Sequence, residues 1–315
     1  MAAEPPLLEI DNLSVAFHTE AGLRPVLDDV SLAVQPREIL GIVGESGSGK
    51  SVMALAIMRL LGEQGVVRDG QIRLDERDLL ALDAETMRRV RGRKIAMIFQ
   101  EPMTSLHPLL RISRQIEEAV ASPDKRAVGI RLLEDVGIPA AATRYDDYPH
   151  RLSGGMRQRV MIAMAMAGHP RLLIADEPTT ALDVTIQAQI LALMRRLREE
   201  RGSAIMFITH DMGVIAQMAD RVAVMYAGQI VETAATRTLL TRPLHPYTRL
   251  LLAAMPTTRH RRATLEVIPG QMPPPGSIAS GCRFRTRCPV AISRCAEETP
   301  ALMTRGDSAV RCWVA

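Results

Sequence analysis

The sequence contains a phosphate-binding motif, G-x-x-x-x-G-K-S, which restricts the fold more than any other feature. Its residues are Gly44, Glu45, Ser46, Gly47, Ser48, Gly49, Lys50 and Ser51. Glycines let successive backbone N–H groups turn inward around phosphate oxygens, because no Cβ atom stands in the way. The lysine reaches the β- and γ-phosphates, and the final serine hydroxyl binds Mg²⁺. The motif therefore predicts a site for a nucleoside triphosphate.

The segments on either side of the motif have the right character for such a site. The apolar run 38–43 predicts a buried strand before the loop, and 52–61 predicts a helix after it. The N-terminus of that helix would point its dipole at the anion. Strand, loop and helix in this order predict an α/β fold.

The remaining elements follow from hydrophobic spacing. Strands are expected at 7–17, 26–34, 70–74, 94–99, 172–175 and 204–208, with a hairpin at 221–231 that closes the sheet. Helices are expected at 112–121, 124–136, 156–167 and 184–201. Strand signals are missing between about 105 and 168, which predicts an inserted helical subdomain. The order strand, helix, strand from 172 to 208 implies a right-handed parallel crossover.

Composition limits the class of protein. The chain has 315 residues, a formal net charge of +4 and 3% aromatic residues. So few aromatic side chains argue against base-stacking platforms, and we expect no nucleic-acid partner. The sequence has neither an apolar run of about 18 residues nor a signal-peptide pattern at its start. We therefore expect a chain that neither spans a membrane nor is exported by itself.

Polar side chains follow three of the expected buried strands. Asp176 and Glu177 follow 172–175, Gln100 follows 94–99, and His210 lies just beyond 204–208. Mg²⁺ beside a phosphate loop needs an acidic partner, which Asp176 can supply, and Glu177 is then placed to activate water. Gln100 can contact Mg²⁺ or the attacking water, and His210 the γ-phosphate.

A second candidate anion site lies at residues 152–159, where a helix is expected to begin. Ser153 can cap this helix, and Gly154 and Gly155 expose backbone N–H groups. One phosphate site in one chain does not need two such sites. Two chains arranged head to tail would use both.

In all, the chain resembles the nucleotide-binding subunit of ATP-binding cassette (ABC) transporters over residues 7–255. The resemblance is carried, in the family's order, by the phosphate loop, Gln100, the signature 152–156, the acidic strand end 172–177, the D-loop 180–183 and His210. The segments 98–106, 177–185 and 244–248, with the cysteine tail, resemble the oligopeptide, dipeptide and nickel import branch. Met156 stands where the broad family usually has Gln, and the insert around 118–128 looks about a dozen residues short.

The resemblance implies a role for each matching residue. Phe17 would stack on adenine, Lys50 and the loop amides would hold the phosphates, and Ser51, Gln100 and Asp176 would serve Mg²⁺. Glu177 would be the general base and His210 the γ-phosphate sensor. Ser153, Gly154 and Gly155 would complete the site of the partner subunit, and Asp183 would couple the two sites.

The resemblance also implies the assembly. We expect an ATP-binding domain over 1–255, containing mixed and antiparallel sheets and the helical subdomain, followed by a small irregular cysteine domain over 256–315. The chain would be an ATPase on the cytoplasmic face of the inner membrane, powering import of di- or oligopeptides, nickel or another small solute. Its partners would be a second ATPase subunit, a paralogue or a copy of itself, two permease subunits and an external solute-binding protein. The rivals are a soluble ABC ATPase acting on nucleic acid or ribosomes, a redox-sensing module and a nucleotide kinase.

The four cysteines all lie in the last 34 residues, at Cys282, Cys288, Cys295 and Cys312. Zinc sites usually contain a pair two to four residues apart, and none occurs here. Four thiolates can instead hold a [4Fe–4S] cluster, as some peptide-import subunits of this type are held to do. Five neighbouring arginines could offset its negative charge. The sequence leaves an iron–sulfur cluster, zinc and metal-free cysteines open.

Overall fold

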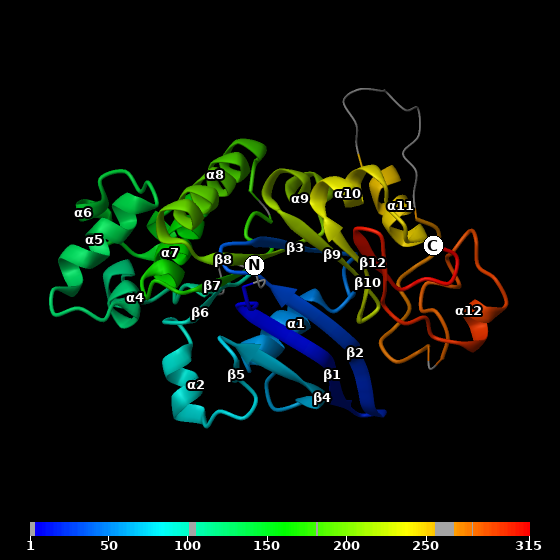
Figure 1. Ribbon diagram of the computed structural model, residues 1–315. Helices are drawn as coiled ribbons and strands as arrows, with labels where there is room; N and C mark the ends of the chain where they lie inside the picture. The colour runs from blue at the N-terminus through cyan, green and yellow to red at the C-terminus, as the bar shows by residue number, and fades with distance from the viewer. Residues whose placement is uncertain (1–3, 101–104, 181, 256–267, 279) are drawn as a thin grey trace. The chain divides into compact units, whose positions relative to one another are not determined.

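The chain forms two compact units, both drawn in Figure 1, a computed structural model. The structure describes residues 4–100, 105–180, 182–255, 268–278 and 280–315. The first unit comprises 1–34, 38–80 and 207–315, and the second 35–37 and 81–206. The phosphate loop and the cysteine segment, residues 268–315 without 279, therefore belong to the same unit.

One sheet of the first unit is antiparallel. Its strands are β1 (Leu8–Thr19), β2 (Gly22–Val34), β4 (Gly65–Leu74) and β5 (Arg77–Asp78), in the order β2-β1-β4-β5. β1 pairs with β2 from Leu8 opposite Val34 to Thr19 opposite Gly22. The pair expected at 7–17 and 26–34 is confirmed, and both strands run further toward their turn than the alternation indicated.

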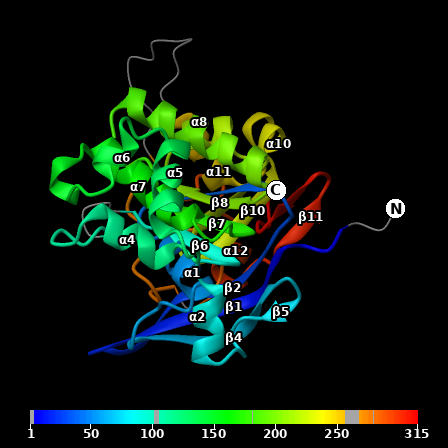
Figure 2. The ribbon, with the colours of Figure 1, turned by 90° about the vertical axis from the view of Figure 1, so that its left-hand side faces the viewer.

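The second sheet contains the strand that precedes the phosphate loop. In the first unit its order is β11-β12-β10-β9-β3-β8, and Figure 2 labels β11 at the edge. β3 pairs with β9 in parallel, whereas β9, β10, β12 and β11 pair antiparallel, so the sheet is mixed. The bounds are β3 (Ile39–Val43), β8 (Ala204–Thr209), β9 (Arg221–Tyr226), β10 (Gln229–Ala235), β11 (Met303–Arg305) and β12 (Ser308–Val310).

The cysteine segment extends this sheet. The expected hairpin is present as β9 and β10, with Ala227 and Gly228 in left-handed conformations at its turn. The expectation that this hairpin closes the sheet is wrong, because β12 pairs with β10 from Glu232 opposite Val310 to Ala234 opposite Ser308. A three-residue strand carries too short an alternating pattern to be read from sequence.

The helices of the first unit are α1 (Lys50–Ile57), α9 (Met212–Met218), α10 (Thr236–Thr241), α11 (Pro246–Ala253) and α12 (Arg294–Glu297). α1 begins inside the phosphate motif, two residues before the expected start, and is capped at Met58. Arg59 then has a positive φ of 52°, which no helix continues. α9 packs against β3, where a Cβ on Gly41 would lie 2.6 Å from Ile215.

The second unit combines parallel strands with the inserted helices. Its strands follow the order β8-β7-β6, with β6 (Ile95–Ile98) and β7 (Leu172–Asp176) parallel. The division between the units falls within β8. The helices are α2 (Ala84–Val90), α4 (Ile112–Ala119), α5 (Lys125–Asp135), α6 (Ala141–Arg144), the 3₁₀ turn η1 (Pro149–Arg151), α7 (Gly154–Met166) and α8 (Val184–Arg201).

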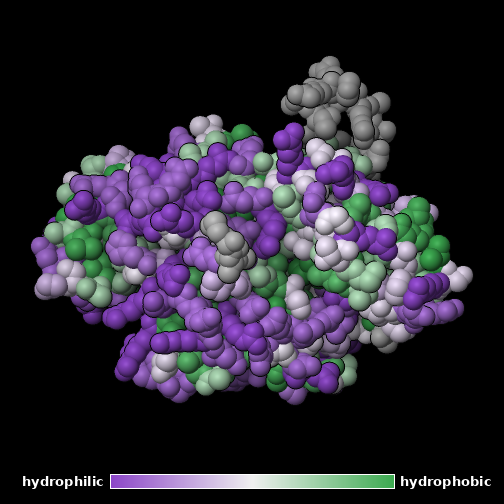
Figure 3. All heavy atoms as spheres, in the orientation of Figure 1, coloured by the Kyte–Doolittle hydropathy of each residue, from purple (hydrophilic) through white to green (hydrophobic). Residues whose placement is uncertain are grey.

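The predicted fold class is confirmed. Between 105 and 168 the structure is helical and contains no strand, as the inserted helical subdomain requires. The bounds 1–255 and 256–315 stay a prediction, since 256–267 lie outside the described residues. Over α8 the surface is hydrophilic (Figure 3), and its buried side chains include Ile190, Met194 and Leu197. In the described ranges no helix is long and apolar enough to cross a membrane.

Candidate functional site

The phosphate loop joins β3 to α1 in the first unit. All five residues of β3 are buried, so the loop leaves the sheet at a fixed point. Gly44 must be glycine, because a Cβ there would lie 2.1 Å from the Met225 carbonyl oxygen. Gly49 has φ 103° and is the N-cap of α1, whose first turn contains no acidic residue. The helix therefore begins with no carboxylate of its own to compete for an anion.

Lys50 is folded against this loop. Its side chain is buried, and Nζ donates to the carbonyl oxygens of Gly44 (2.7 Å) and Glu45 (2.9 Å) and to the Ser48 hydroxyl (3.2 Å). Ser46 and Gly47 are exposed at the tip, and Ser51 is half-buried in the first turn of α1. The ammonium group is thus held at the centre of the loop, where phosphate oxygens would bind.

Two other predicted residues belong to the first unit. Phe17 is half-buried in β1, beside Gly65 of β4, where a Cβ would lie 3.1 Å from the ring. His210 is exposed directly after β8. The next residue, Asp211, accepts hydrogen bonds from the N–H groups of Gly213 (2.7 Å) and Val214 (3.3 Å) and caps α9. The Asp211 cap therefore fixes the backbone next to His210.

The acidic pair ends β7 in the second unit. Asp176 is buried, with 4% of its surface exposed, and Glu177 has a positive φ of 47°. The Glu177 carboxylate accepts hydrogen bonds from the Thr180 hydroxyl (2.7 Å) and from the Gln100 amide (3.3 Å). The structure therefore brings Gln100 and Glu177 together, as their positions at neighbouring strand ends predict. A left-handed glutamate is a strained conformation of the kind found at functional sites.

The signature segment begins α7 and contacts the start of α8. Ser153 is the N-cap, and its hydroxyl accepts a hydrogen bond from the Met156 N–H (3.3 Å). A Cβ on Gly155 would lie 2.7 Å from Ile186, whereas among the described residues a Cβ on Gly154 would come no closer than 4.0 Å, to Leu182. Asp183 caps α8 by accepting from the Ile186 N–H (2.9 Å).

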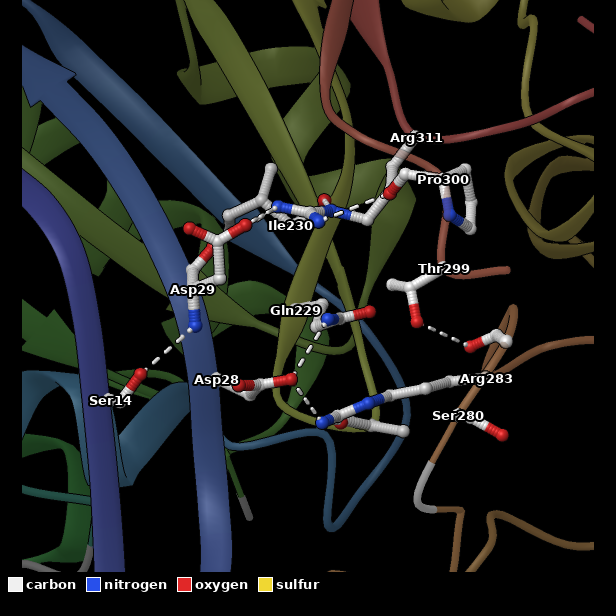
Figure 4. A network of polar contacts seen from close by, with 12 residues as sticks. Ser14, Asp28, Asp29, Gln229, Ile230, Ser280, Arg283, Thr299, Pro300 and Arg311 are labelled. Carbon is white, nitrogen blue, oxygen red and sulfur yellow. Dashed lines mark hydrogen bonds and ion pairs between the residues drawn. The ribbon is translucent and has the colours of Figure 1, made fainter. Parts of the chain in front are cut away.

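The arginines beside the cysteines have partners on other elements. Arg283 pairs with Asp28 of β2 (2.5 Å) and contacts the Ala227 carbonyl oxygen, and Arg311 pairs with Asp29 (2.9 Å), as Figure 4 shows. Arg287 pairs with Glu45 (2.8 Å). That these arginines offset a cluster's charge stays a prediction; the structure adds that each of the three faces a carboxylate.

The remaining two arginines stay within the cysteine segment. Arg285 donates to the carbonyl oxygens of Ser280 (2.5 Å) and Cys282 (3.3 Å). Arg294 pairs with Glu298 and lies over the Trp313 ring, 3.6 Å from its centroid. These contacts stabilise the segment locally.

The four thiols are close enough to influence one another. Burial raises the pKa of Cys282 to about 11, and the neighbouring thiols add to the increase. Burial also raises the pKa of Cys288 and Cys312. No disulfide joins the four. Within the described residues, no group of three or more Cys, His, Asp or Glu side chains is arranged to hold a metal ion.

Two residues at the phosphate loop were not expected from the sequence. Arg287 and Tyr247 both contact Glu45, the second residue of the motif. The motif at 244–248 suggested only a family branch, and Arg287 drew attention only as a neighbour of a cysteine. Thr180, the donor to Glu177, was noted solely as part of the D-loop.

The chain matches two families of known proteins. Residues 27–180 match the family described as ABC transporter, and 231–295 match the oligopeptide/dipeptide transporter C-terminal region. A putative peptide import ATP-binding protein of Brucella abortus is 49% identical over 98% of this chain and 94% of its own length. The oligopeptide transport ATP-binding protein AppD of Bacillus subtilis is 45% identical over 98% of this chain and 96% of its own.

Solved structures agree with these relatives. The dimeric bacterial ABC transporter cassette MJ0796 is 28% identical, with a TM-score of 0.65, and the match covers 73% of this chain and 99% of that one. A post-hydrolysis state of the same cassette, bound to ADP and Pi, is 27% identical with the same TM-score. In both, the similarity leaves about a quarter of the present chain uncovered.

Proposed function

Because the chain belongs to the ABC transporter family, as an ATP-binding subunit of the oligopeptide/dipeptide branch, we propose that it hydrolyses ATP to power the uptake of di- or oligopeptides. One observation carries the proposal: identity of 45–49% to peptide-import and oligopeptide-transport subunits extends over 98% of the chain. It therefore includes the cysteine segment outside the cassette. Nickel or another small solute is the alternative cargo.

Each predicted site residue has its own role toward ATP. Lys50 and the amides of the loop 44–49 bind the phosphates, Phe17 stacks on adenine, and His210 senses the γ-phosphate. Ser51, Gln100 and Asp176 would hold Mg²⁺, for which hydroxyl, amide and carboxylate oxygens are suitable ligands. When bound, the ion offsets charge on the β- and γ-phosphates. Glu177 is the general base, and the contacts of its carboxylate with Thr180 and Gln100 support this role by fixing its orientation.

Two ATPase subunits complete each other's sites. Ser153, Gly154 and Gly155 of one subunit face the nucleotide held by the other, and Asp183 couples the two sites. The capped start of α7, which presents backbone N–H groups, supports this role. The partner is a paralogue of this chain, and a homodimer is the alternative.

The transporter is completed by two permease subunits and an external solute-binding protein, with this chain peripheral on the cytoplasmic face of the membrane. Exposed apolar side chains of the second unit support a contact with the permeases. Leu109 is 79% exposed, Phe99 40% and Leu110 37%. Exposed apolar side chains of this size are candidates for an interaction surface.

Reconstitution tests the transport function. The chain is assembled in proteoliposomes with its permease subunits, a second ATPase subunit and the solute-binding protein, and uptake of a labelled peptide is measured. We expect peptide-stimulated ATP hydrolysis and uptake, both lost in Lys50→Ala. ATP hydrolysis stimulated by DNA or ribosomes, with no response to peptide, would instead support the soluble ABC ATPase. Uptake of Ni²⁺ without uptake of peptide would instead show that nickel is the transported solute.

The cysteine segment is proposed to hold a [4Fe–4S] cluster on Cys282, Cys288, Cys295 and Cys312. Support comes from the gathering of all four cysteines in the last 34 residues, with no disulfide among them. Anaerobic purification should yield brown protein with about four irons per chain. One zinc per chain, or colourless protein without metal, would contradict the cluster and favour the other two states.

A further inference from the structure

Glu45 of the phosphate loop is held by two residues that lie far from it in the sequence. The Arg287 guanidinium pairs with both carboxylate oxygens, through Nη1 to Oε2 (2.8 Å) and Nη2 to Oε1 (3.1 Å). The backbone N–H of Glu45 donates to the Tyr247 hydroxyl (2.9 Å). Both the side chain and the backbone of this loop residue are therefore fixed by residues that lie between β10 and β11 in the sequence.

These two supports are themselves buried and anchored. The Arg287 side chain is 5% exposed, and its Nε donates to the Pro269 carbonyl oxygen (2.7 Å). The guanidinium also lies 5.8 Å from the centre of the Tyr226 ring. An exposed ion pair contributes little to stability. The Arg287–Glu45 pair is stronger, because it is bidentate, its arginine is buried and further contacts hold that arginine in place.

Tyr247 is fixed by the start of α11. Its N–H donates to His245 Nδ1 (3.0 Å), and the buried Glu232 carboxylate accepts from the N–H groups of Leu244 (2.8 Å) and His245 (2.9 Å). The Tyr247 ring packs edge-on against Tyr226, with 4.7 Å between centroids. Phe284 of the cysteine segment lies 5.4 Å from Tyr247 and 5.1 Å from Tyr226. The Tyr247 hydroxyl that accepts from the loop is thus held in place by ring packing among Tyr226, Tyr247 and Phe284.

Charge explains why Glu45 needs such support. Its carboxylate is carried by a loop whose backbone is built to approach phosphate oxygens. An unpaired carboxylate there would repel a triphosphate, and the effect would be stronger than in bulk water because the site is partly buried. A guanidinium on both oxygens cancels the charge and keeps the carboxylate turned toward the cysteine segment.

We propose that Arg287, assisted by Tyr247, is a positioning residue for ATP binding: it neutralises and orients Glu45, so the phosphate loop stays in its phosphate-accepting form. In this role Arg287 acts through its ion pair with Glu45. The cysteine segment is therefore part of the machinery that prepares the ATP site. This inference rests on the proposed phosphate-binding role of residues 44–51.

The test compares Arg287→Ala with Arg311→Ala. Both arginines precede a cysteine, both side chains are nearly buried (5% and 6% exposed), and both pair with a carboxylate, but Arg311 pairs with Asp29, away from the loop. The KM for MgATP, the kcat and the Tm are measured on the full chain. We expect Arg287→Ala to raise the KM about tenfold or more, with kcat within about threefold of wild type. Arg311→Ala should lower Tm by a similar amount while leaving KM within about twofold.

Rescue distinguishes the charge effect from a loss of structure. In Glu45→Gln/Arg287→Ala there is no carboxylate to neutralise, so KM should return to within about threefold of wild type. Salt should also reduce the KM defect of Arg287→Ala, because ions screen the repulsion. If Arg287→Ala does not fold, Arg287→Lys, which keeps the charge and loses the bidentate geometry, is expected to show an intermediate KM.

Three results would overturn the proposal: an unchanged KM in Arg287→Ala, an equal rise in Arg311→Ala, or no recovery in the double variant. Failure of the ATP-site assignment looks different. In that case wild type itself would not bind ATP, or Lys50→Ala would bind it as tightly as wild type.

Discussion

Gly155 of the signature segment lies against Ile186 of α8 so closely that a Cβ atom on Gly155 would stand 2.7 Å from Ile186 Cγ2. The Ile186 N–H is itself bound by the Asp183 carboxylate (2.9 Å). The starts of α7 and α8 therefore pack as one piece within the second unit. A displacement of Asp183 would be passed to the signature glycines through Ile186, since close-packed side chains have little room to yield.

Substitution of Gly155 tests this contact. Gly155→Ala should lower the free energy of unfolding by about 1–3 kcal/mol, because the added methyl group forces Ile186 out of place. Urea unfolding measures the change. Gly154→Ala is the matched control, since its Cβ would lie 4.0 Å from Leu182, the nearest atom in the part of the chain that the structure describes. Equal destabilisation by the two substitutions would show that the Gly155–Ile186 contact is not tightly packed.

Asp183 is expected to have a structural role besides the proposed coupling role. Asp183→Ala removes the N-cap of α8 and should cost about 1 kcal/mol of stability, whereas Asp183→Asn keeps a capping oxygen and should cost a few tenths. If Asp183 also couples two ATP sites, Asp183→Asn should reduce cooperative ATP hydrolysis while the urea midpoint stays near that of wild type. A loss of cooperativity only in Asp183→Ala would reduce its role to helix capping.

Glu177→Gln should separate ATP binding from hydrolysis. The amide keeps the shape of the side chain but cannot accept a proton, so turnover should fall by about 10²–10⁴ while ATP binding is retained. Single-turnover hydrolysis and equilibrium binding of labelled ATP provide the two measurements. The variant should also accumulate a nucleotide-bound dimer, detectable by its mass in solution. Turnover equal to that of wild type would remove Glu177 from the role of general base.

His245 should make the protein sensitive to acid. Burial lowers its pKa from 6.5 to about 3 in the folded state, so the unfolded chain binds the proton more readily. Stability contributed by the neutral form is present above pH 6.5 and is lost as the pH falls toward 3, by an amount of the order of 5 kcal/mol.

Asparagine at position 245 tests that pH dependence. Its side-chain oxygen can still accept the Tyr247 N–H, so His245→Asn should flatten the decline in urea midpoint between pH 6.5 and pH 4. His150, which is exposed, supplies the control: His150→Asn should keep the wild-type decline. If His245→Asn declines as steeply as wild type, protonation of other groups causes the acid sensitivity.

Local sequence was sufficient to predict a feature wherever that feature depends on residues close together in the chain. The loop 44–51 could be read directly, because its glycines, lysine and serine act within one turn of backbone. Ser153 was predicted as an N-cap from its place before two glycines and a helical pattern, and its bond to the Met156 N–H confirms this. The strands 39–43 and 172–176 were legible because buried parallel strands are continuous apolar runs.

Contacts between distant residues could not be read in this way. Arg287 and Glu45 are 242 positions apart, and Tyr247 and Glu45 are 202 apart. No periodicity or spacing relates them, because they meet only after the sheet has assembled around β9 and β10. The arginines beside the cysteines were noted only for their charge, and the sequence did not indicate that three of them pair with Asp28, Asp29 and Glu45.

By itself, then, the sequence predicted a nucleoside triphosphate as ligand and the class of the fold. It could do so because phosphate loops and buried strands are recognised from short, contiguous runs of residues. Only the tertiary structure decided that the cysteine segment adds β12 to the sheet and that Arg287 reaches the phosphate loop. The physical reason is that an ion pair or a pair of strands forms between residues far apart in the sequence. Such residues come together only when the chain between them has folded.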